Sequence, residues 1–404
     1  MKNKDMGKDT EIKTVVPTLR FPEFITGKHW YISKVKDIYQ ITRGQILAVS
    51  LVKEIKDDIY IYPVYSSQTK NGGLVGYYND YLYENAITWT TDGANAGDVN
   101  YRSGKFYCTN VCGVLLNQKG FSNKCMAEII NSVTRNYVSY VGNPKLMNGV
   151  MGDIIISVPP TIEERQKITD CLSSLDELIK STAQKVEILK DHKKALMQRL
   201  FPAEGKNVPE FRFPEFQGMK GWEITYIYEE CPNTYSGGTP KTIEKKYYGG
   251  NIPFIRSAEI GKDKTELFIT QEGLNNSSAK MVQKGDLLIA LYGANSGDIA
   301  ISKIDGAINQ AILCLKARNN NLFIYYGLLR KQKDIVSKYL QGGQGNLSGE
   351  IIKSIDFYIP QGIEQQKIAD CLFSLDELIE VTSQKVEILK EHKKGLMQQL
   401  FPKI

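Results

Sequence analysis

The chain has 404 residues, of which 42% are hydrophobic and 24% charged, an ordinary composition for a globular protein of two or three domains. Its 51 basic and 45 acidic residues give a net charge of +6, which is compatible with a nucleic-acid partner without demonstrating one. No stretch approaches the roughly 18 consecutive apolar residues of a membrane span, and the charged opening MKNKDMGKDTEIKT lacks an apolar secretory segment. We therefore expect a cytoplasmic protein.

The cysteines and histidines do not predict a metal site. The seven cysteines form no CxxC pair, and Cys171 and Cys371 occupy one repeated position, so we expect reduced, mostly buried thiols. Two of the three histidines, His192 and His392, are also one repeated position. We expect both at a surface or interface rather than as catalytic bases, and we predict no Ser/His/Asp or Cys/His catalytic set.

Three sequence markers occur twice in the same order, so the chain is a doubled unit. VPTLRFPEF at residues 16–24 matches VPEFRFPEF at 208–216, and GANAGD at 93–98 matches GANSGD at 293–298. Residues 166–202 and 366–402 are identical at 29 of 37 positions. The segments between these markers are far less alike, which indicates two nearly constant helices and two divergent inserts.

The inserts, roughly residues 25–158 and 217–357, are predicted to be α/β or β-rich. Short β-branched and aromatic runs such as IYIYPVY, AITWTT, GDLLIALY and IDFYIP lie between Gly/Asn/Asp clusters, and residues 321–340 form the clearest helical stretch. The GANxGD motif joins two such runs and is not followed by GK[ST], so we interpret it as a hairpin turn. A DNA-backbone contact through Asn95 and Asn295 is the alternative.

The repeated segment predicts a long helix with a heptad seam. Its seam residues advance by alternating steps of three and four: Leu172, Leu175, Ile179, Thr182, Val186, Leu189, Lys193, Leu196 and Leu200. A helix of roughly 39 residues would be about 58 Å long, and it would end at a proline in both copies. We expect the two copies to pack on each other antiparallel with a pseudo-two-fold. The alternative is that each helix covers only the core of its own domain.

Several polar residues of the helix recur although they cannot all face one seam. Either a recent duplication preserved them or two identical partner subunits bind two equivalent surfaces, and the divergence of the inserts favours the partners. The candidate partner-binding residues are Gln184, Lys185, Glu187, Lys190, His192, Lys193, Gln384, Lys385, Glu387, Lys390, His392 and Lys393.

The order of these phrases resembles the specificity (HsdS-type) subunit of type I DNA restriction-modification systems over essentially the whole chain. The resemblance rests on the paired SLDELI…QKVEILK helices, the RFPEF leads, YPVYSSQTKNGGLVGYY at 62–78 and SGGTPKTIEKKYYGGNIPFIRSAEI at 236–260. IPQGIEQQKIADCL at 359–372 is a further typical phrase. The first insert departs from this pattern, because it has ITRGQ at 41–45 where the second has GGTPK.

The resemblance implies an α/β (α+β) fold with two globular target recognition domains separated by two long helices packed as an antiparallel coiled coil. The expected boundaries are 1–158 for the first domain, 159–202 for the central helix, 203–357 for the second domain and 358–404 for the C-terminal helix. Each domain would recognise one half of a bipartite, asymmetric site in double-stranded DNA. The helices would set the spacing and dock two methyltransferase subunits, with restriction (motor) subunits joining that bacterial or archaeal complex.

The resemblance also implies a non-catalytic chain without a cofactor of its own. S-adenosylmethionine, ATP and Mg would belong to the partner subunits, whose adenine methylation or DNA cleavage this chain would direct. In agreement, the sequence has no P-loop, no Rossmann glycine fingerprint and no Asn/Asp-Pro-Pro-aromatic methyltransferase motif. Two alternatives are a coiled-coil adaptor that binds proteins without sequence-specific DNA binding, and an enzyme such as a nuclease.

Polar residues in the turn-rich phrases of both inserts are the candidates for DNA contact. Arginine or lysine suits guanine and Asn or Gln suits adenine, although a solvated loop or a turn would use the same residues. The candidates are Arg43, Gln45, Ser66, Ser67, Gln68, Lys70, Asn71, Arg102, Lys105, Thr109 and Asn110 in the first insert, and Thr239, Lys241, Thr242, Lys245, Lys246, Arg256, Ser257, Asn309, Gln310, Gln344 and Asn346 in the second.

Overall fold

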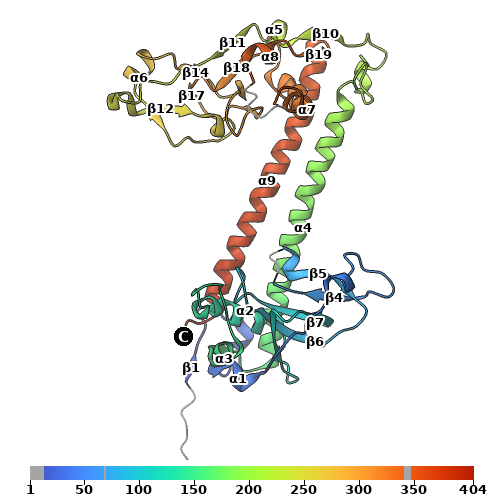
Figure 1. Cartoon of the computed structure of the whole chain (residues 1–404), viewed down its shortest axis with the longest axis vertical. Coiled ribbons are helices and arrows are strands. Elements are labelled where there is room, and N and C mark those ends of the chain that lie inside the picture. Colours follow the sequence, from blue (N-terminus) through green and yellow to red (C-terminus); the bar gives the residue numbers. More distant parts are fainter. Residues whose placement is uncertain (1–12, 68–69, 341–346) are drawn as a thin grey trace, which may run out of the picture. The chain divides into compact units, whose positions relative to one another are not determined.

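The structure is a computed structural model that describes residues 13–67, 70–340 and 347–404 (Figure 1). It divides into two compact units, of which the first comprises residues 1–183 together with 385–404 and the second comprises residues 184–384. Two long helices, α4 (Ile162–Leu200) and α9 (Gly362–Leu400), each contribute residues to both units. This division cuts across the sequence repeat, so the functional boundaries proposed from the sequence stay a prediction.

The first unit contains a six-stranded and a three-stranded sheet. The larger sheet has the order β3-β8-β6-β7-β4-β5 and is antiparallel except for the pair β4 and β7, and the smaller has the antiparallel order β1-β2-β9. The strands are β1 (Thr14–Val15), β2 (Trp30–Lys34), β3 (Gln40–Arg43), β4 (Tyr62–Tyr65), β5 (Leu74–Tyr78), β6 (Tyr83–Thr90), β7 (Val99–Cys108), β8 (Cys112–Leu116) and β9 (Ile155–Val158). The shorter helices are α1 (Val35–Ile38), α2 (Lys124–Thr134) and α3 (Asn148–Asp153).

The second unit distributes its strands over three sheets, with the orders β10-β19, β11-β18-β15-β16 and β13-β12-β17-β14. The strands are β10 (Glu223–Tyr226), β11 (Asn233–Ser236), β12 (Tyr248–Ile255), β13 (Phe268–Ile269), β14 (Lys280–Val282), β15 (Leu287–Ala290), β16 (Ile299–Ile301), β17 (Gly306–Ile308), β18 (Ile312–Lys316) and β19 (Asp356–Ile359). The helices besides α4 and α9 are α5 (Ile227–Glu230), α6 (Gln271–Asn275), α7 (Asn321–Leu340) and α8 (Gly349–Lys353). The helix predicted over residues 321–340 and the quoted strand phrases are confirmed.

Each unit has a core that uses the beginning of one long helix and the end of the other. In the first unit, Leu172 near the start of α4 and the pair Leu400–Phe401 at the end of α9 are buried in the same hydrophobic cluster as Trp30 and Trp89. Because opposite ends of the two helices meet in one core, the helices run antiparallel there. The second unit repeats this arrangement: Leu372 near the start of α9 shares a cluster with Leu200, Phe201, Trp222 and Phe323.

The predicted antiparallel helix pairing is therefore confirmed within each unit, and so is the seam. The nine seam residues of α4 are all buried or half-buried, and so are their counterparts from Leu372 to Leu400. The alternative, in which each helix covers only the core of its own domain, describes the start of each helix but not its end. The start of each helix packs on the insert that precedes it, whereas its end completes the core of the other unit.

The repeated RFPEF marker places an arginine on the first turn of a long helix. Arg20 donates from Nε and Nη2 to the two carboxylate oxygens of Glu164 at 2.7 and 2.8 Å, and the indole of Trp30 donates to the same carboxylate at 2.9 Å. The side chains of Arg20 and Glu164 are only 6% and 1% exposed, so this is a buried bidentate ion pair. Its hydrogen bonds and charge raise the pKa of Arg20 against the opposing effect of burial.

The second unit contains the same three-residue cluster. Arg212 donates to both carboxylate oxygens of Glu364 at 2.8 and 2.7 Å, and Trp222 donates to Glu364 at 3.2 Å. The marker, the tryptophan that follows it and the glutamate of the helix are thus repeated because together they attach the start of each insert to a helix N-terminus. That end of a helix also favours a negative charge.

Replacing Arg20 by alanine should lower the free energy of unfolding of the first unit by about 3–5 kcal/mol, because Glu164 would remain buried without a partner. Urea denaturation followed by tryptophan fluorescence measures this loss. The matched control is Lys167→Ala, which removes a half-exposed pair with Glu23 and an ammonium contact 5.7 Å from the ring centre of Phe21, and should cost less than about 1 kcal/mol. Equal losses in the two variants would contradict the structural role assigned to Arg20.

Candidate nucleic-acid interface

In each insert, an early strand is followed directly by a glycine that packs against a turn. Gly44 follows β3, and a Cβ atom placed on it would lie 2.3 Å from the carbonyl oxygens of Cys108 and Thr109. Gly237 follows β11, and its Cβ would lie 1.8 Å from the carbonyl oxygen of Ile308. No other residue fits at such an approach. The ITRGQ phrase thus preserves the glycine that the GGTPK phrase also supplies, and only the residues around it differ.

The first-insert candidates gather around the turn between β7 and β8. The backbone N–H of Gln45 donates to the carbonyl of Cys108 at 3.1 Å, which brings the strand that carries Arg43 to this turn. The hydroxyl of Thr109 donates to that of Ser66 at 2.9 Å. The cluster thus consists of Arg43, Gln45, Ser66, Ser67, Thr109 and Asn110, of which Gln45 and Asn110 are exposed. The Nε of Arg43 is buried and has no hydrogen-bond partner among the described residues.

Arg102, Asn71 and Lys105 lie beside this cluster. The guanidinium of Arg102 lies 3.8 Å from the ring centre of Tyr65 and donates to the carbonyl of Gly72 at 2.8 Å. Burial lowers the pKa of Arg102, and its contacts fix the turn in which Asn71 has a positive φ of 51°. Arg102 therefore holds the turn that carries Asn71, and its own side chain is engaged within the protein. Lys105 places its ammonium 4.5 Å from the ring centre of Tyr81.

In the second insert, the equivalent turn between β17 and β18 joins three candidates. The hydroxyl of Thr239 donates to the side-chain oxygen of Gln310 at 2.9 Å, and the N–H of Gly237 donates to the carbonyl of Asn309 at 3.2 Å. Lys241, Thr242 and Lys245 are exposed on the following segment. The turn and the segment that follows the glycine thus occupy the same place in both inserts. The polar side chains that they expose differ between the inserts.

The remaining candidates of the second insert either form contacts within the protein or lie outside the described residues. Arg256 is paired with Glu259 at 3.0 Å and with Glu266 at 2.6 Å, and Lys246 is paired with Glu272 at 2.5 Å. Burial acts to raise the pKa of Glu259, but hydrogen bonds from Arg256 and from the backbone hold it at about 2. Ser257 lies half-buried in the same short turn. The predictions that lie outside the described residues are Gln68, the side chain of Lys70, Gln344 and Asn346.

Sequence reasoning missed the exposed apolar side chains beside these clusters. After Gly44, Ile46, Val49 and Ile55 are 82%, 87% and 79% exposed, and after Gly237, Ile243 is 86% exposed. Lysines occur within two residues of Ile55 (Lys53 and Lys56) and of Ile243 (Lys241 and Lys245). Apolar side chains can contact the methyl group of thymine, so these segments can offer both charge and apolar surface to a duplex. The short phrases KEIK at 53–56 and KTIEK at 241–245, in which an isoleucine lies between lysines, were the available signal.

The GANxGD motif is a hairpin turn, as predicted. In the first copy, between β6 and β7, the N–H of Gly97 donates to the carbonyl of Thr90 at 2.9 Å with φ at +90°. The second copy, between β15 and β16, repeats this bond at Gly297, where φ is +92°. Asn95 donates to the carbonyl of Ser67 and Asn295 to the carboxylate of Asp298, each at 3.0 Å. The side-chain amides of the motif are therefore engaged within the protein.

Comparison with known proteins identifies the repeated domain. Residues 27–190 and 219–391, more than half of the chain, match the family model for the type I restriction modification DNA specificity domain. The chain belongs to the type I restriction-modification specificity family. It contains two specificity domains, each including one insert and most of the helix that follows it.

Two relatives show how far this likeness extends. The chain is 26% identical to the specificity subunit of the type I restriction enzyme MjaVIII of Methanocaldococcus jannaschii, with 95% of this chain and 93% of that protein covered. It is 37% identical over 149 residues to a Mycoplasma pneumoniae chain named among type I specificity subunits, but the match spans only 47% of that chain. The chain thus covers about half the length of that relative.

Solved structures show the same fold. The type I S subunit from M. genitalium aligns with a TM-score of 0.69 at 17% identity, over 96% of this chain and all of that one. A chain from a structural study of assembly and conformational transition in a type I restriction-modification system aligns with a TM-score of 0.56 at 14% identity, covering 92% and 97% of the two chains. The specificity fold is therefore shared at low sequence identity.

Most candidate partner-binding residues lie exposed on the long helices of this specificity protein. On α4, Lys185, Ile188 and His192 follow one another by three and four residues and lie on one exposed face, where Ile188 is 68% exposed. Ile388 repeats this position on α9 with the same exposure. Sequence reasoning missed the two isoleucines, although their repetition outside the seam was visible. Gln184, Glu187, Lys190, Gln384, Lys385, Glu387, Lys390 and His392 are also exposed.

Lys193 and Lys393 differ from the rest of this set because the helix pair itself uses them. Lys193 on α4 pairs with Asp376 on α9 at 2.5 Å, and Lys393 on α9 pairs with Asp176 on α4 at 2.9 Å. Lys393 also pairs with Glu128 of the first insert at 3.1 Å. Burial acts to lower the pKa of Lys393, but the two carboxylates raise it above its ordinary value. Folding therefore accounts for the repetition of both lysines.

The described part of the chain contains no group of three or more His, Cys, Asp or Glu side chains that could hold a metal ion. All seven cysteines are free, and burial raises the pKa of Cys112 to about 11, so that this thiol stays protonated at neutral pH. No helix in the described ranges is long and apolar enough to cross a membrane.

Replacing Gly44 by alanine should cost about 1–3 kcal/mol of folding stability, because the new Cβ would displace the turn at Cys108 and Thr109. Thermal unfolding of the purified chain measures this effect. Gly149→Ala is the matched control, since that glycine lies in α3, where an added Cβ would meet no atom within 4 Å, and the change should be neutral or stabilising. A neutral Gly44→Ala variant would contradict the close approach.

Proposed function

We propose that this chain is the DNA-recognition subunit of a type I restriction-modification complex and that it is not itself catalytic. One observation carries the proposal: the same glycine and turn occur in both inserts, but the exposed side chains around them differ. A repeated frame with different polar groups suits two halves of one asymmetric DNA site. Phosphate contacts would fix the register, and base-edge contacts by residues such as Gln45, Asn110 and Gln310 would supply specificity.

The exposed, repeated faces of α4 and α9 support docking of two identical methyltransferase subunits. Each face combines lysine, isoleucine and histidine, so it offers apolar surface as well as charge. Restriction subunits would join through the complex. S-adenosylmethionine, ATP and Mg would be held by those partners, and the complex would act in the cytoplasm, where the DNA of a bacterium or archaeon lies.

Exchanging residues 25–158 for the corresponding insert of another specificity protein should change one half of the methylated site and leave the other half intact. Long-read sequencing of genomic DNA from cells that carry the exchanged chain and its methyltransferase measures the methylated positions. Exchange of residues 217–357 is the reciprocal control and should change the opposite half. A change in both halves, or in neither, would contradict the assignment of one half-site to each insert.

The affinity of the assembled complex for its duplex should fall steeply with salt, with a slope near −0.9 for each phosphate that it neutralises. Fluorescence anisotropy at several salt concentrations measures this slope. A scrambled duplex should show a similar slope at lower affinity, because phosphate contacts carry no sequence information. A coiled-coil adaptor would show neither the slope nor the preference, and the absence of both would remove DNA recognition as the function.

A further inference from the structure

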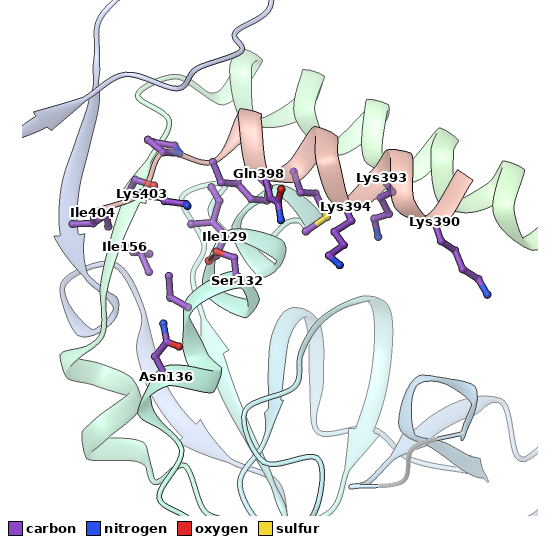
Figure 2. A pocket seen from close by; sticks show the side chains of 15 residues that line it. Ile129, Ser132, Asn136, Ile156, Lys390, Lys393, Lys394, Gln398, Lys403 and Ile404 are labelled. Carbon is purple, nitrogen blue, oxygen red and sulfur yellow. Dashed lines mark hydrogen bonds between the residues drawn. The ribbon is translucent and has the colours of Figure 1, made fainter. Parts of the chain in front are cut away.

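A basic cavity of about 600 Å³ lies within the first unit, at the end of α9 (Figure 2). The last turns of α9, helix α2 and strand β9 form its walls. In Figure 2, Ile129, Ser132 and Asn136 face the cavity from the insert, and Lys390, Lys393, Lys394 and Gln398 project from α9 on the opposite side. The cavity is distinct from the β7–β8 turn and contains none of the candidate DNA-contact residues.

The charged side chains of this cavity are of one sign. Lys390, Lys393, Lys394 and Lys403 line it, and its described lining contains no Asp or Glu side chain. Lys393 is already neutralised by Asp176 and Glu128. The other three lysines are more available. Among the described residues, Lys390 and Lys394 pair only with exposed glutamates one turn earlier on α9, at 2.7 and 3.9 Å, and exposed pairs of this kind contribute little.

The floor of the cavity is apolar. Ile129 and Val133 of α2, Ile156 of β9, and Met397 and Phe401 at the end of α9 line it. A ligand that consists of phosphate alone would satisfy the lysines but leave this apolar surface in water. A ligand that combines carboxylates with an apolar anchor would match both parts, because burial of the anchor removes apolar area from water.

The second unit offers an internal comparison. At the end of α4, a cavity of about 490 Å³ is lined by Phe201 and Pro202, by α7 and by β19, the same elements in the fold. Its charged lining is mixed, since Arg330, Lys331 and Lys338 are accompanied by Glu204, Asp334 and Asp356. The helix ends are nearly identical in sequence, but Lys190, Lys193 and Lys194 of α4 do not line the second cavity, whereas their counterparts on α9 line the first. The acidic side chains of the second cavity come from the insert and from the residues after α4.

We propose that the cavity at the end of α9 is a docking site for an acidic segment of a partner protein, with an apolar side chain of that segment inserted between α2 and α9. The carboxylates of the segment pair with Lys390, Lys394 and Lys403. Because the equivalent cavity at the end of α4 carries charges of both signs, the chain binds one such segment. Each chain thus binds one copy of this partner, although most of its own structure is repeated. The proposal does not depend on DNA recognition.

The test uses a short fluorescein-labelled peptide of Asp and Glu around a central Leu-Phe pair, titrated with the full chain and followed by anisotropy. Saturation at one peptide per chain is expected. Lys394→Glu should weaken binding about tenfold, because it replaces an attraction by a repulsion. Lys194→Glu is the matched control: it makes the same change at the repeated position on α4 and should leave the Kd within about twofold. Both lysines are exposed, so neither change should affect folding.

Two further peptides and a duplex complete the experiment. A peptide with Gln in place of Asp and Glu should not bind, and one with Ser in place of Leu-Phe should bind more weakly. Equal loss in the two lysine variants, two peptides bound per chain, or equal binding of the neutral peptide would overturn the proposal. Displacement of the peptide by non-specific duplex DNA would overturn it in favour of a DNA-backbone site.

Discussion

The burial of a helix end in the core of each unit is the constraint on which the remaining structure depends. Leu400 and Phe401 complete the first core, and Leu200 and Phe201 complete the second. Each long helix packs on one insert at its start and in the core of the other unit at its end. Its sequence is therefore constrained at both ends. This requirement, together with the Lys–Asp pairs, explains much of the identity between the two helices that partner binding would otherwise have to explain.

The divergent inserts vary within limits that the structure makes explicit. Gly44 and Gly237 must remain glycine because a carbonyl oxygen occupies the place of a side chain. The glutamates at the starts of α4 and α9 must keep an arginine and a tryptophan. Side chains on the turns beyond these points face no such requirement, so specificity can change there without rebuilding the core.

The sequence predicted the doubled architecture, the long helices and the hairpin turns because each has a local period or a repeated phrase. It did not predict that Arg20 would pair with Glu164, since the two residues are 144 positions apart. Nor did it separate Lys193 from its exposed neighbours, because the heptad places it in the seam while its charge suggests the surface. Among the DNA candidates, only the structure distinguishes the exposed Asn110 from Arg102, which holds a turn.

The two units differ in whether their residues are continuous in sequence. The second unit is one continuous segment, whereas the first combines residues 1–183 with residues 385–404. During synthesis from the N-terminus, the second unit can close as soon as its own residues have emerged, but the first unit must wait for the last turns of α9. A chain interrupted before Leu400 would leave the first core open to water. Folding of the first domain is thereby coupled to the synthesis of α9, so that prematurely ended chains expose an unfinished core that proteases can attack.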